Sequence, residues 1–425
     1  MLREFAVHIV QTLVDAGYTA FWAGGCVRDL LLEKEPNDYD VATNATPDQV
    51  RDLFGRRRTL AVGESFGVVI VLGPKGSGLN VEVATFRSET GYHDGRRPTD
   101  VVFSTPEMDA QRRDFTINGM FFDPLSKTVH DFVGGKEDLQ RKLVRAIGVP
   151  RDRMTEDKLR LLRAVRFAAV LSFDLDSETA AAVQEMAHQV IIVSAERIAQ
   201  ELRKMLAHPN RARAMRLLEG LRLLEVIFPE VHEQTVHISE ESWLNRLHVL
   251  QRLEEASFEL AMAALLRDVP CPAGRRDRSN EEPGTVLAVC RRLKLSNEET
   301  DSIVWLAQHR DRVSRLADAM PSEWKPVAAE PLFSDLFRCE RLEAELAGEQ
   351  LEPFDRLAEL LRPLSPEDLN PPELLTGQDL IALGHTPGRQ FKEWLKQIRD
   401  AQLNGEIVSK EEAIAKVRDM AHDPS

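Results

Sequence analysis

The sequence predicts an α+β head at the N-terminus, followed by an elongated all-α neck, body and tail. Three observations lead to this fold class. Apolar segments of strand length alternate with helical patterns through the first third of the chain. From about Glu137 onward the strand patterns vanish and helical periodicity takes over, so the head ends near residue 145. A proline-rich linker at 361–372 then separates a tail. We expect a head at 1–145, a neck at 146–215, a body at 216–360 and a tail at 361–425.

Length and composition agree with this division. At about 150 residues per domain, 425 residues make about three domains, and 43% hydrophobic with 29% charged residues is typical of a soluble globular chain. No apolar run reaches about 18 residues and the N-terminus has no signal-peptide pattern, so we expect no membrane span. Four scattered cysteines without metal-ligand spacing indicate reduced thiols and a cytoplasmic location.

The formal charge of −14 argues against a uniformly basic nucleic-acid binder, although a local basic surface remains open. Such a surface is compatible with gripping one RNA along one face. Solvated surface positions explain some of the arginine clusters equally well. The clusters are Arg56 to Arg58, Arg96 and Arg97, Arg112 and Arg113, and then Arg160, Arg163 and Arg166.

The head begins with a helix over residues 1–17, and the first candidate site follows it. An apolar segment, 18–23, reads as a strand, and a helical pattern begins at Val27. Between them, Gly24 and Gly25 let backbone N–H groups approach a ligand, and a helix N-terminus favours an anion. Arg28 adds a forked positive charge that suits phosphate. The stretch therefore predicts a phosphate-binding turn, with an ordinary tight turn as the alternative.

Asp38 and Asp40 flank Tyr39 in what we expect to be the next strand. Alternate residues of a strand share a face, so both carboxylates would point the same way. Two like charges this close call for a cation, and a divalent metal is the usual one. Strands at 67–72 and 79–86 follow, and Glu82 in the second could complete a three-carboxylate site. An exposed strand face is the alternative for Glu82, and the polar stretch 88–101 reads as a long loop.

A polar stripe begins the neck. Thr155 would cap a helix that runs to Phe167, with Asp157, Arg160, Arg163 and Arg166 in steps of three. Cytosine and adenine both present an amine donor beside a ring-nitrogen acceptor, so Asp157 could accept from the amine while Arg160 donates to the ring nitrogen. Uracil and guanine would leave this pair unsatisfied, at roughly 1–3 kcal/mol or more. An ordinary amphipathic helix gives such a stripe too.

Taken together, these motifs carry a resemblance. The chain has Gly-Gly-x-x-Arg-Asp (24–29), Asp-x-Asp (38–40), Arg-Arg-Asp-Phe-Thr-Ile-Asn-Gly-Met (112–120) and Glu-Asp-x-x-Arg-x-x-Arg-x-x-Arg-Phe (156–167). It resembles the class II CCA-adding enzymes and bacterial poly(A) polymerases, within the DNA polymerase β-like nucleotidyltransferases. Gly119 departs from the commoner alanine of the third motif.

The resemblance implies roles for individual residues. Arg113 would contact the triphosphate, Asp114 would accept a hydrogen bond from the ribose, and the helix containing Asp157 would select the nucleotide. The segment 94–98 matches a mobile loop beside the family's active site, and residues 375–403 match its C-terminal module. Arg197 and Glu201, at i and i+4 of a further family motif, are expected to brace the neck by a salt bridge.

The first hypothesis is a template-independent RNA nucleotidyltransferase that builds the tRNA 3′ end from CTP and ATP. Mg²⁺ would be held by Asp38 and Asp40, and the protein would be a monomer or homodimer. An enzyme that adds only A, or a poly(A) polymerase, is the close rival. A non-catalytic RNA-binding protein and small-molecule nucleotidyl transfer are the others. The segment 259–268 resembles the His-Asp helix of HD phosphohydrolases, but Arg267 occupies the histidine position, which argues against that activity.

Overall fold

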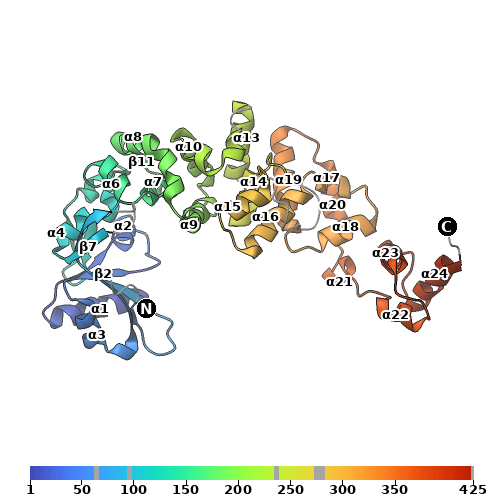
Figure 1. Cartoon of the computed structure of the whole chain (residues 1–425), viewed down its shortest axis with the longest axis horizontal. Coiled ribbons are helices and arrows are strands. Elements are labelled where there is room, and N and C mark those ends of the chain that lie inside the picture. The colour runs from blue at the N-terminus through green and yellow to red at the C-terminus, as the bar shows by residue number, and fades with distance from the viewer. Residues whose placement is uncertain (62–66, 93–97, 234–238, 272–282, 423–425) are drawn as a thin grey trace. The chain divides into compact units, whose positions relative to one another are not determined.

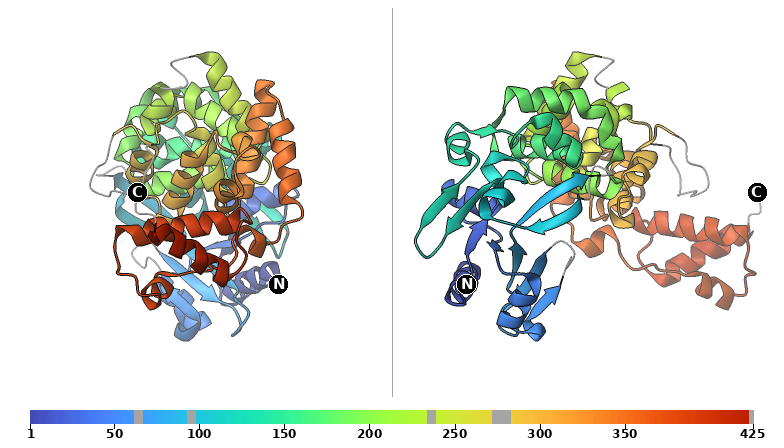
Figure 2. Two further views of the ribbon diagram at one scale, coloured as in Figure 1. Left: turned by 90° about the vertical axis from the view of Figure 1, so that its right-hand side faces the viewer. Right: turned by 60° about the vertical axis from the view of Figure 1, so that its left-hand side comes forward.

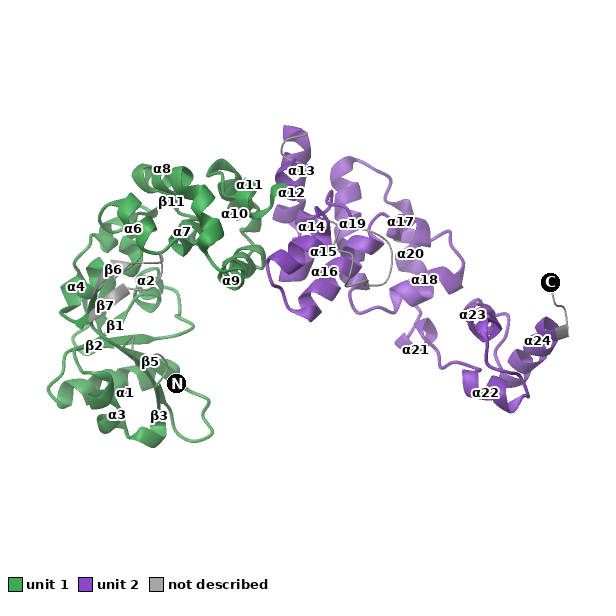
Figure 3. Cartoon of the chain, viewed as in Figure 1, with its two compact units in different colours: residues 1–229 green, residues 230–425 purple. Residues whose placement is uncertain are grey.

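A computed structural model of the chain describes residues 1–61, 67–92, 98–233, 239–271 and 283–422. The chain forms two compact units, Met1–Pro229 and Glu230–Ser425 (Figure 3). The first contains a mixed β-sheet with helices, and the second is helical in its described part. The predicted fold class, an α+β head followed by a mostly helical remainder, is confirmed.

The head is built on a seven-stranded sheet in the order β3-β4-β5-β2-β1-β8-β9. Its strand β2 is labelled in the blue part of the chain in Figure 1. Only β2 and β5 pair in parallel; the other neighbours in this sheet are antiparallel. Its strands are β1 (Ala20–Ala23), β2 (Asp40–Thr43), β3 (Thr59–Ala61), β4 (Val68–Leu72), β5 (Asn80–Thr85), β8 (Met120–Asp123) and β9 (Thr128–Asp131). The strands predicted at 18–23, 67–72 and 79–86 are all present, whereas β2 begins at Asp40, so Asp38 and Tyr39 precede it.

Helices cover the sheet (Figure 2). Helix α1 packs on β1 and β2 through an apolar face that includes Ile9 and Leu13, and α3 packs on β4 and β5. A capping box between Thr46 and Gln49 begins α3, as the Thr-Pro sequence predicts. The helical segments of the head are α1 (Leu2–Asp15), α2 (Gly25–Leu31), α3 (Pro47–Phe54), η1 (Arg56–Arg58), α4 (Pro106–Gln111), η3 (Thr116–Asn118) and α5 (Gly135–Gln140).

The prediction of a polar loop at 88–101 is wrong. Most of it forms an antiparallel hairpin of β6 (Arg87–Tyr92) and β7 (Pro98–Phe103). Pairing with a second strand that contains the β-branched residues Thr99, Val101 and Val102 gives the polar first strand a ladder of backbone hydrogen bonds, which polarity alone does not reveal. Residues 93–97, which include most of the expected mobile loop at 94–98, lie outside the described residues.

The neck completes the first unit. Helix α7 is its central element and packs against α9 and α10, with Leu161, Leu162 and Val165 fully buried. One short parallel pair of strands, β10 and β11, persists beyond residue 137. The elements are β10 (Leu143–Val144), α6 (Pro150–Glu156), α7 (Leu159–Leu171), β11 (Asp174–Leu175), α8 (Ser177–Met186), η4 (Ala187–Ile192), α9 (Ala195–Leu206), α10 (Arg211–Gly220), α11 (Leu224–Ile227) and α12 (Pro229–Val231), the last at the boundary between the units.

The second unit is a body of helices followed by a tail with an apolar cluster of its own. That cluster joins Leu375, Leu380, Ile398, Ala401, Ile407, Ala413 and Val417. Across the described residues, no helix is both long and apolar enough to cross a membrane. The helices are α13 (Glu240–Arg252), α14 (Phe258–Leu265), α15 (Val286–Arg292), α16 (Asn297–His309), α17 (Val313–Leu316), α18 (Pro321–Ala328), α19 (Phe333–Ala347), α20 (Glu352–Leu361), α21 (Pro366–Leu369), α22 (Gly377–Ala382), α23 (Arg389–Leu403) and α24 (Lys410–His422).

Candidate active site

One cleft of the first unit gathers most of the residues that the sequence singled out. Its volume is about 520 Å³, and it lies where α2, the start of β2, the segment 112–118 and α7 meet. Of the predicted site residues, Glu82 and Arg166 do not line it. The lining residues are Gly24, Gly25, Arg28, Asp29, Asp38, Asp40, Arg112, Arg113, Asp114, Asn118, Asp157, Arg160, Arg163 and Phe167.

The glycine turn forms one end of the cleft. Gly24 has φ of +75°, a conformation that side chains disfavour, and it precedes the first turn of α2. A Cβ atom at this position would lie 3.0 Å from the Arg113 guanidinium, so glycine leaves room for that cation. Arg28 is held from two sides, because its Nε donates to Asp29 Oδ1 at 2.8 Å and its Nη1 donates to Asn118 Oδ1 at 2.7 Å. The turn therefore places the fixed Arg28 guanidinium beside two glycines that line the cleft.

Two aspartates, Asp38 and Asp40, line the cleft and are called the acidic pair below. Asp40 is opposite Glu82 in the parallel register of β2 and β5, which places their side chains on the same face of the sheet. Although Asp40 is open to the cleft, the surrounding protein displaces bulk water, and this desolvation, followed by the like charges of Asp38 and Glu82, raises its pKa to about 6. Arg113 opposes that rise. The pair is therefore short of positive charge.

This donor set fits a divalent cation, because carboxylate oxygens that repel each other are stabilised by a hard cation between them. Glu82 remains a predicted third ligand. In the parts of the chain that the structure describes, no three His, Cys, Asp or Glu side chains already lie close enough to hold a metal ion.

Arg113 is oriented by a residue that sequence reasoning missed. Asp109, on α4, is buried and accepts hydrogen bonds from the Nη2 of Arg113 at 3.0 Å and the Nε of Arg112 at 2.8 Å. Burial alone would raise the pKa of Asp109, but the two guanidinium groups outweigh it and hold the pKa below its usual value. The pattern Asp-x-x-Arg-Arg, with helical spacing of three and four, is the signal that could have revealed this pairing.

Asp114 joins the head to the neck. Its Oδ2 accepts from Arg163 Nε at 2.8 Å and Nη2 at 2.5 Å, and its Oδ1 accepts from the Phe115 amide and from Asn118 Nδ2. Burial would raise the pKa of Asp114, but Arg163 and these hydrogen bonds hold it at about 2. The carboxylate is therefore ionised across the physiological range.

The helix expected to begin at Thr155 does not begin where the sequence suggested. Helix α6 ends at Glu156, α7 begins at Leu159, and Asp157 lies between them in an extended conformation. Thr155 lies in the last turn of α6 and donates to the Arg151 carbonyl, so it caps nothing. The cap position of α7 is Lys158, whose side chain makes no capping bond. Asp157, just before it, accepts from the Leu159 amide at 3.0 Å, as a short acidic side chain does two residues ahead of an amide.

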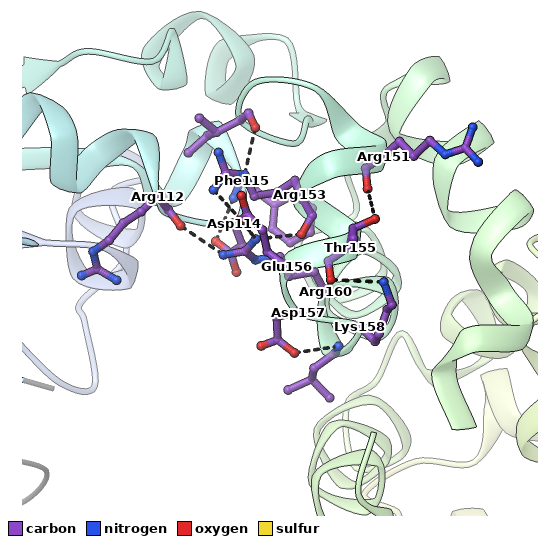
Figure 4. A network of polar contacts seen from close by, with 12 residues as sticks. Arg112, Asp114, Phe115, Arg151, Arg153, Thr155, Glu156, Asp157, Lys158 and Arg160 are labelled. Carbon is purple, nitrogen blue, oxygen red and sulfur yellow. Dashed lines mark hydrogen bonds and ion pairs between the residues drawn. The ribbon is translucent and has the colours of Figure 1, made fainter. Parts of the chain in front are cut away.

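Asp157 and Arg160 are each fixed by other residues (Figure 4). Arg197 donates to both oxygens of Asp157, at 2.8 and 3.3 Å. The Nη1 of Arg160 donates to Glu156 at 2.6 Å and to the Arg153 carbonyl at 2.7 Å, while its Nη2 donates to the Arg112 carbonyl at 3.1 Å. The two side chains thus line the cleft with a set geometry, and Arg160 connects the neck to the backbone of the head.

Two predictions about the rest of the stripe need correction. Arg166 does not reach the cleft lining, because its Nε donates to Glu201 at 2.5 Å. The expected bridge between Arg197 and Glu201 is replaced by the Asp157–Arg197 and Arg166–Glu201 pairs. Both pairs still join α9 to the segment around α7, so the bracing function of α9 holds while its partners differ.

Comparisons with known proteins agree with this geometry. A Poly A polymerase head domain model matches residues 20–145, and a model of a probable RNA- and SrmB-binding site of polymerase A matches residues 172–235. A CCA-adding enzyme of Bacillus pumilus (strain SAFR-032) is 43% identical over 221 residues, which cover 52% of this chain and 54% of the relative. In that alignment the chain spans about half the length of its relative.

Two further similarities extend over nearly the whole chain. A CCA-adding enzyme of Bacillus subtilis (strain 168) is 32% identical over 415 residues, which cover 96% of each protein. The crystal structure of a Bacillus stearothermophilus CCA-adding enzyme in complex with CTP superposes with a TM-score of 0.70 at 28% identity, and covers 98% of this chain and 97% of that one.

Proposed function

The chain belongs to the CCA-adding enzyme family, and we propose that it is a template-independent RNA nucleotidyltransferase that adds CCA to the tRNA 3′ end from CTP and ATP. One observation carries the proposal. The acidic pair, the glycine turn with its arginines, and the Asp157–Arg160 pair all line one cleft. Such a cleft can hold the reacting phosphate, the attacking RNA end and the base of the incoming nucleotide together.

Nucleotidyltransferases are generally metal-dependent, and we propose that this chain uses Mg²⁺. Asp38 and Asp40 would hold it, with Glu82 as the third candidate, because burial of Asp40 and the like charges of Asp38 and Glu82 raise the pKa of Asp40, and a bound cation would offset both effects. When bound, the metal would supply Lewis-acid activation of the RNA 3′-hydroxyl and neutralise charge on the leaving pyrophosphate. The remaining work falls to side chains that position the substrates.

Gly24, Gly25, Arg28 and Arg113 would hold the triphosphate. Gly24 and Gly25 line the cleft, and the two guanidinium groups are already fixed by Asp29, Asn118 and Asp109. Preorganised cations cost little to orient when the substrate arrives, so they favour the in-line geometry that nucleotidyl transfer requires.

Asp157 and Arg160 would select the base. Asp157 can accept from the exocyclic amine of cytosine or adenine, while Arg160 donates to the adjacent ring nitrogen. Because Arg197 and Glu156 hold the two side chains, a uracil or guanine would place a carbonyl oxygen against the Asp157 carboxylate, and two acceptors cannot form a hydrogen bond with each other. Asp114 lies beside them for the ribose, and a carboxylate has lone pairs to accept more than the bonds from Arg163.

We propose the same division of labour along the chain as the sequence suggested: catalysis in 1–145, base selection in 146–215, a helical body in 216–360 and tRNA binding in 361–425. In the tail, Lys410 pairs with Asp379 and Lys416 with Glu406, so Lys392 and Lys396 on α23 are the better candidates for phosphate contacts. All four cysteines are free thiols, which suits the cytoplasm as the proposed location.

The decisive experiment supplies tRNA that ends at the discriminator base with CTP alone, ATP alone, or both. The proposal expects two additions from CTP alone, one further A when both are present, and no incorporation from ATP alone. The alternative, an A-adding enzyme or poly(A) polymerase, is favoured by the Poly A polymerase match of the head. Incorporation from ATP alone would select that alternative, and no incorporation under any condition would favour a non-catalytic RNA-binding protein.

A further inference from the structure

Three guanidinium groups surround one phenylalanine in the cleft. The ring of Phe167, on α7, has the guanidinium carbon of Arg166 at 4.0 Å from its centroid, that of Arg163 at 5.2 Å and that of Arg28 at 5.3 Å. Each lies within the roughly 6 Å over which a cation is attracted to a ring face. Phe167 is 6% exposed and lines the cleft. A ring that merely filled the core would not gather three cations.

The cations do not gather there for want of other partners. Arg163 is bound to Asp114, Arg166 to Glu201, and Arg28 to Asp29 and Asn118. Each guanidinium is therefore held between an acceptor on one side and the Phe167 ring on the other. Because three like charges repel each other, this arrangement needs both kinds of contact to stay in place.

Five of these side chains form a closed circuit across the cleft. Arg28 donates to Asn118 at 2.7 Å, Asn118 donates to Asp114 at 3.2 Å, Asp114 accepts from Arg163 at 2.8 Å, and both arginines lie by Phe167. Arg28, Asn118 and Asp114 come from the head, whereas Arg163 and Phe167 come from the neck. All five line the cleft. The ring thus closes a connection between the glycine turn and the base-reading helix.

We propose that Phe167 is a positioning residue that couples the triphosphate-binding Arg28 to the base-reading helix, so that phosphate binding and base selection form a single preorganised site. This inference rests on the proposed function. Phe167 itself acts through the two arginines rather than on the reacting atoms. Weakening the negative face of its ring releases Arg28, which loosens the triphosphate, and Arg163, which loosens the segment that presents Asp157.

The cleanest test keeps the size of the ring and changes only its charge distribution. In the full-length protein, Phe167 is replaced by mono-, di- and trifluorinated phenylalanine, which draw electron density from the ring face. We expect the KM for CTP and for ATP to rise stepwise, by about tenfold at the trifluorinated ring, with kcat changed by less than about twofold. Discrimination against UTP should fall in parallel. The same series at Phe115, which packs edge-on against Phe167 at 5.7 Å, is the matched control and should leave KM unchanged.

Conventional variants give an independent reading. Phe167→Tyr retains a ring face and should stay within about twofold of the wild-type KM, whereas Phe167→Leu should behave like the trifluorinated protein. A flat KM across the fluorinated series, or equal losses in F167Y and F167L, would overturn the inference. The proposed function fails separately, because in that case the wild-type protein itself does not incorporate CTP and ATP in the expected order.

Discussion

A charged cavity of the first unit can be compared with one of the second, and the two differ in how their charges are paired. The cleft of the first unit has a volume of about 520 Å³, and a cavity among α13, α17, α19 and α20 of the second has about 420 Å³. Both are lined by arginines and carboxylates. In the second unit, Arg246 and Arg267 each contact two carboxylates of the surrounding helices. In the first, burial of Asp40, followed by the like charges of Asp38 and Glu82, raises the pKa of Asp40, and Arg113 opposes that rise.

In the second unit, ion pairs between arginines and carboxylates hold the helices around the cavity together. Glu343 accepts from Arg246 and from Arg267, each at 2.9 Å, and Arg267 also contacts Asp311. Burial would lower the pKa of Arg267, but Asp311 and Glu343 outweigh it and raise the pKa above its usual value. By the resemblance of 259–268 to an HD helix, this guanidinium stands at the histidine position, and the lack of phosphohydrolase activity stays a prediction. In the second unit the arginines and carboxylates therefore bind each other, whereas in the first the carboxylates of Asp38 and Asp40 are proposed to bind a metal ion.

Removing charge from the cleft should have the largest effect. Asp40→Ala deletes one of the two proposed metal-binding carboxylates, and we expect nucleotide incorporation to fall by about 10³-fold or more, with tRNA binding retained. Single-nucleotide incorporation and filter binding of tRNA measure the two quantities. Asp311→Ala, which removes a carboxylate from the cavity of the second unit, is the control and should incorporate normally. Turnover of D40A near the wild-type level would break the comparison.

Removing charge from the second cavity should cost stability instead. Arg246→Ala leaves Glu343 and Asp268 without one of their cations, and we expect the free energy of unfolding to fall by about 3 kcal/mol. Four of the five tryptophans, Trp243, Trp305, Trp324 and Trp394, lie in the second unit, so urea unfolding followed by tryptophan fluorescence reports on it. The KM for CTP should not change. A changed KM with intact stability would mean that this cavity serves the reaction.

Glu340 allows a smaller, pH-dependent test. It is 7% exposed, and burial, followed by Asp311 and Glu343, raises its pKa to about 7, although the Val313 amide opposes the rise. Because the folded state then holds its proton more tightly than the unfolded chain does, unfolding free energy is lost as pH rises from about 4.5 to about 7. Glu340→Gln should therefore be more stable than the wild type by about 2 kcal/mol at pH 8 and nearly equal at pH 4.5. Equal urea midpoints at both pH values would contradict the raised pKa.

The smallest expected effect concerns the pH dependence of incorporation. Protonation of Asp40, with its pKa of about 6, competes with the proposed metal, so at subsaturating Mg²⁺ the rate should fall about tenfold between pH 7 and pH 5. Saturating metal should shift this fall to lower pH. Rates measured at several Mg²⁺ concentrations test this, and a profile that does not move with Mg²⁺ would assign the titration to another group.

What the sequence could and could not predict follows from the distance along the chain over which each feature is decided. The strand, glycine turn and helix at 20–31 are set by neighbouring residues, so their pattern was sufficient. The Asp-x-Asp pattern brought both carboxylates to the cleft lining, but it did not show that the strand begins only at Asp40. The partner of Asp157 is Arg197, and that of Arg166 is Glu201, 40 and 35 positions away. Several arginines compete for each carboxylate in this region, and only the packing of α9 against α7 decides among them.

The misplaced helix start illustrates the same limit at short range. Thr155 and Asp157 are both good capping residues, and the pattern favoured the earlier one. A preceding helix, α6, already includes Thr155, so α7 begins after Lys158, and Asp157 accepts from the Leu159 amide just inside it. Asp109 is a different case, because its partners Arg112 and Arg113 lie only three and four positions away and the pattern itself could have revealed the pairing.

The attachment of Arg160 bears on how successive additions could proceed. Its guanidinium donates to the Arg112 and Arg153 carbonyls and to Glu156, and these bonds hold it in one position. A side chain held in this way cannot follow the RNA as it grows. After each addition the new RNA 3′ end would therefore have to shift back to the same position, so that the substrate and not Arg160 would move.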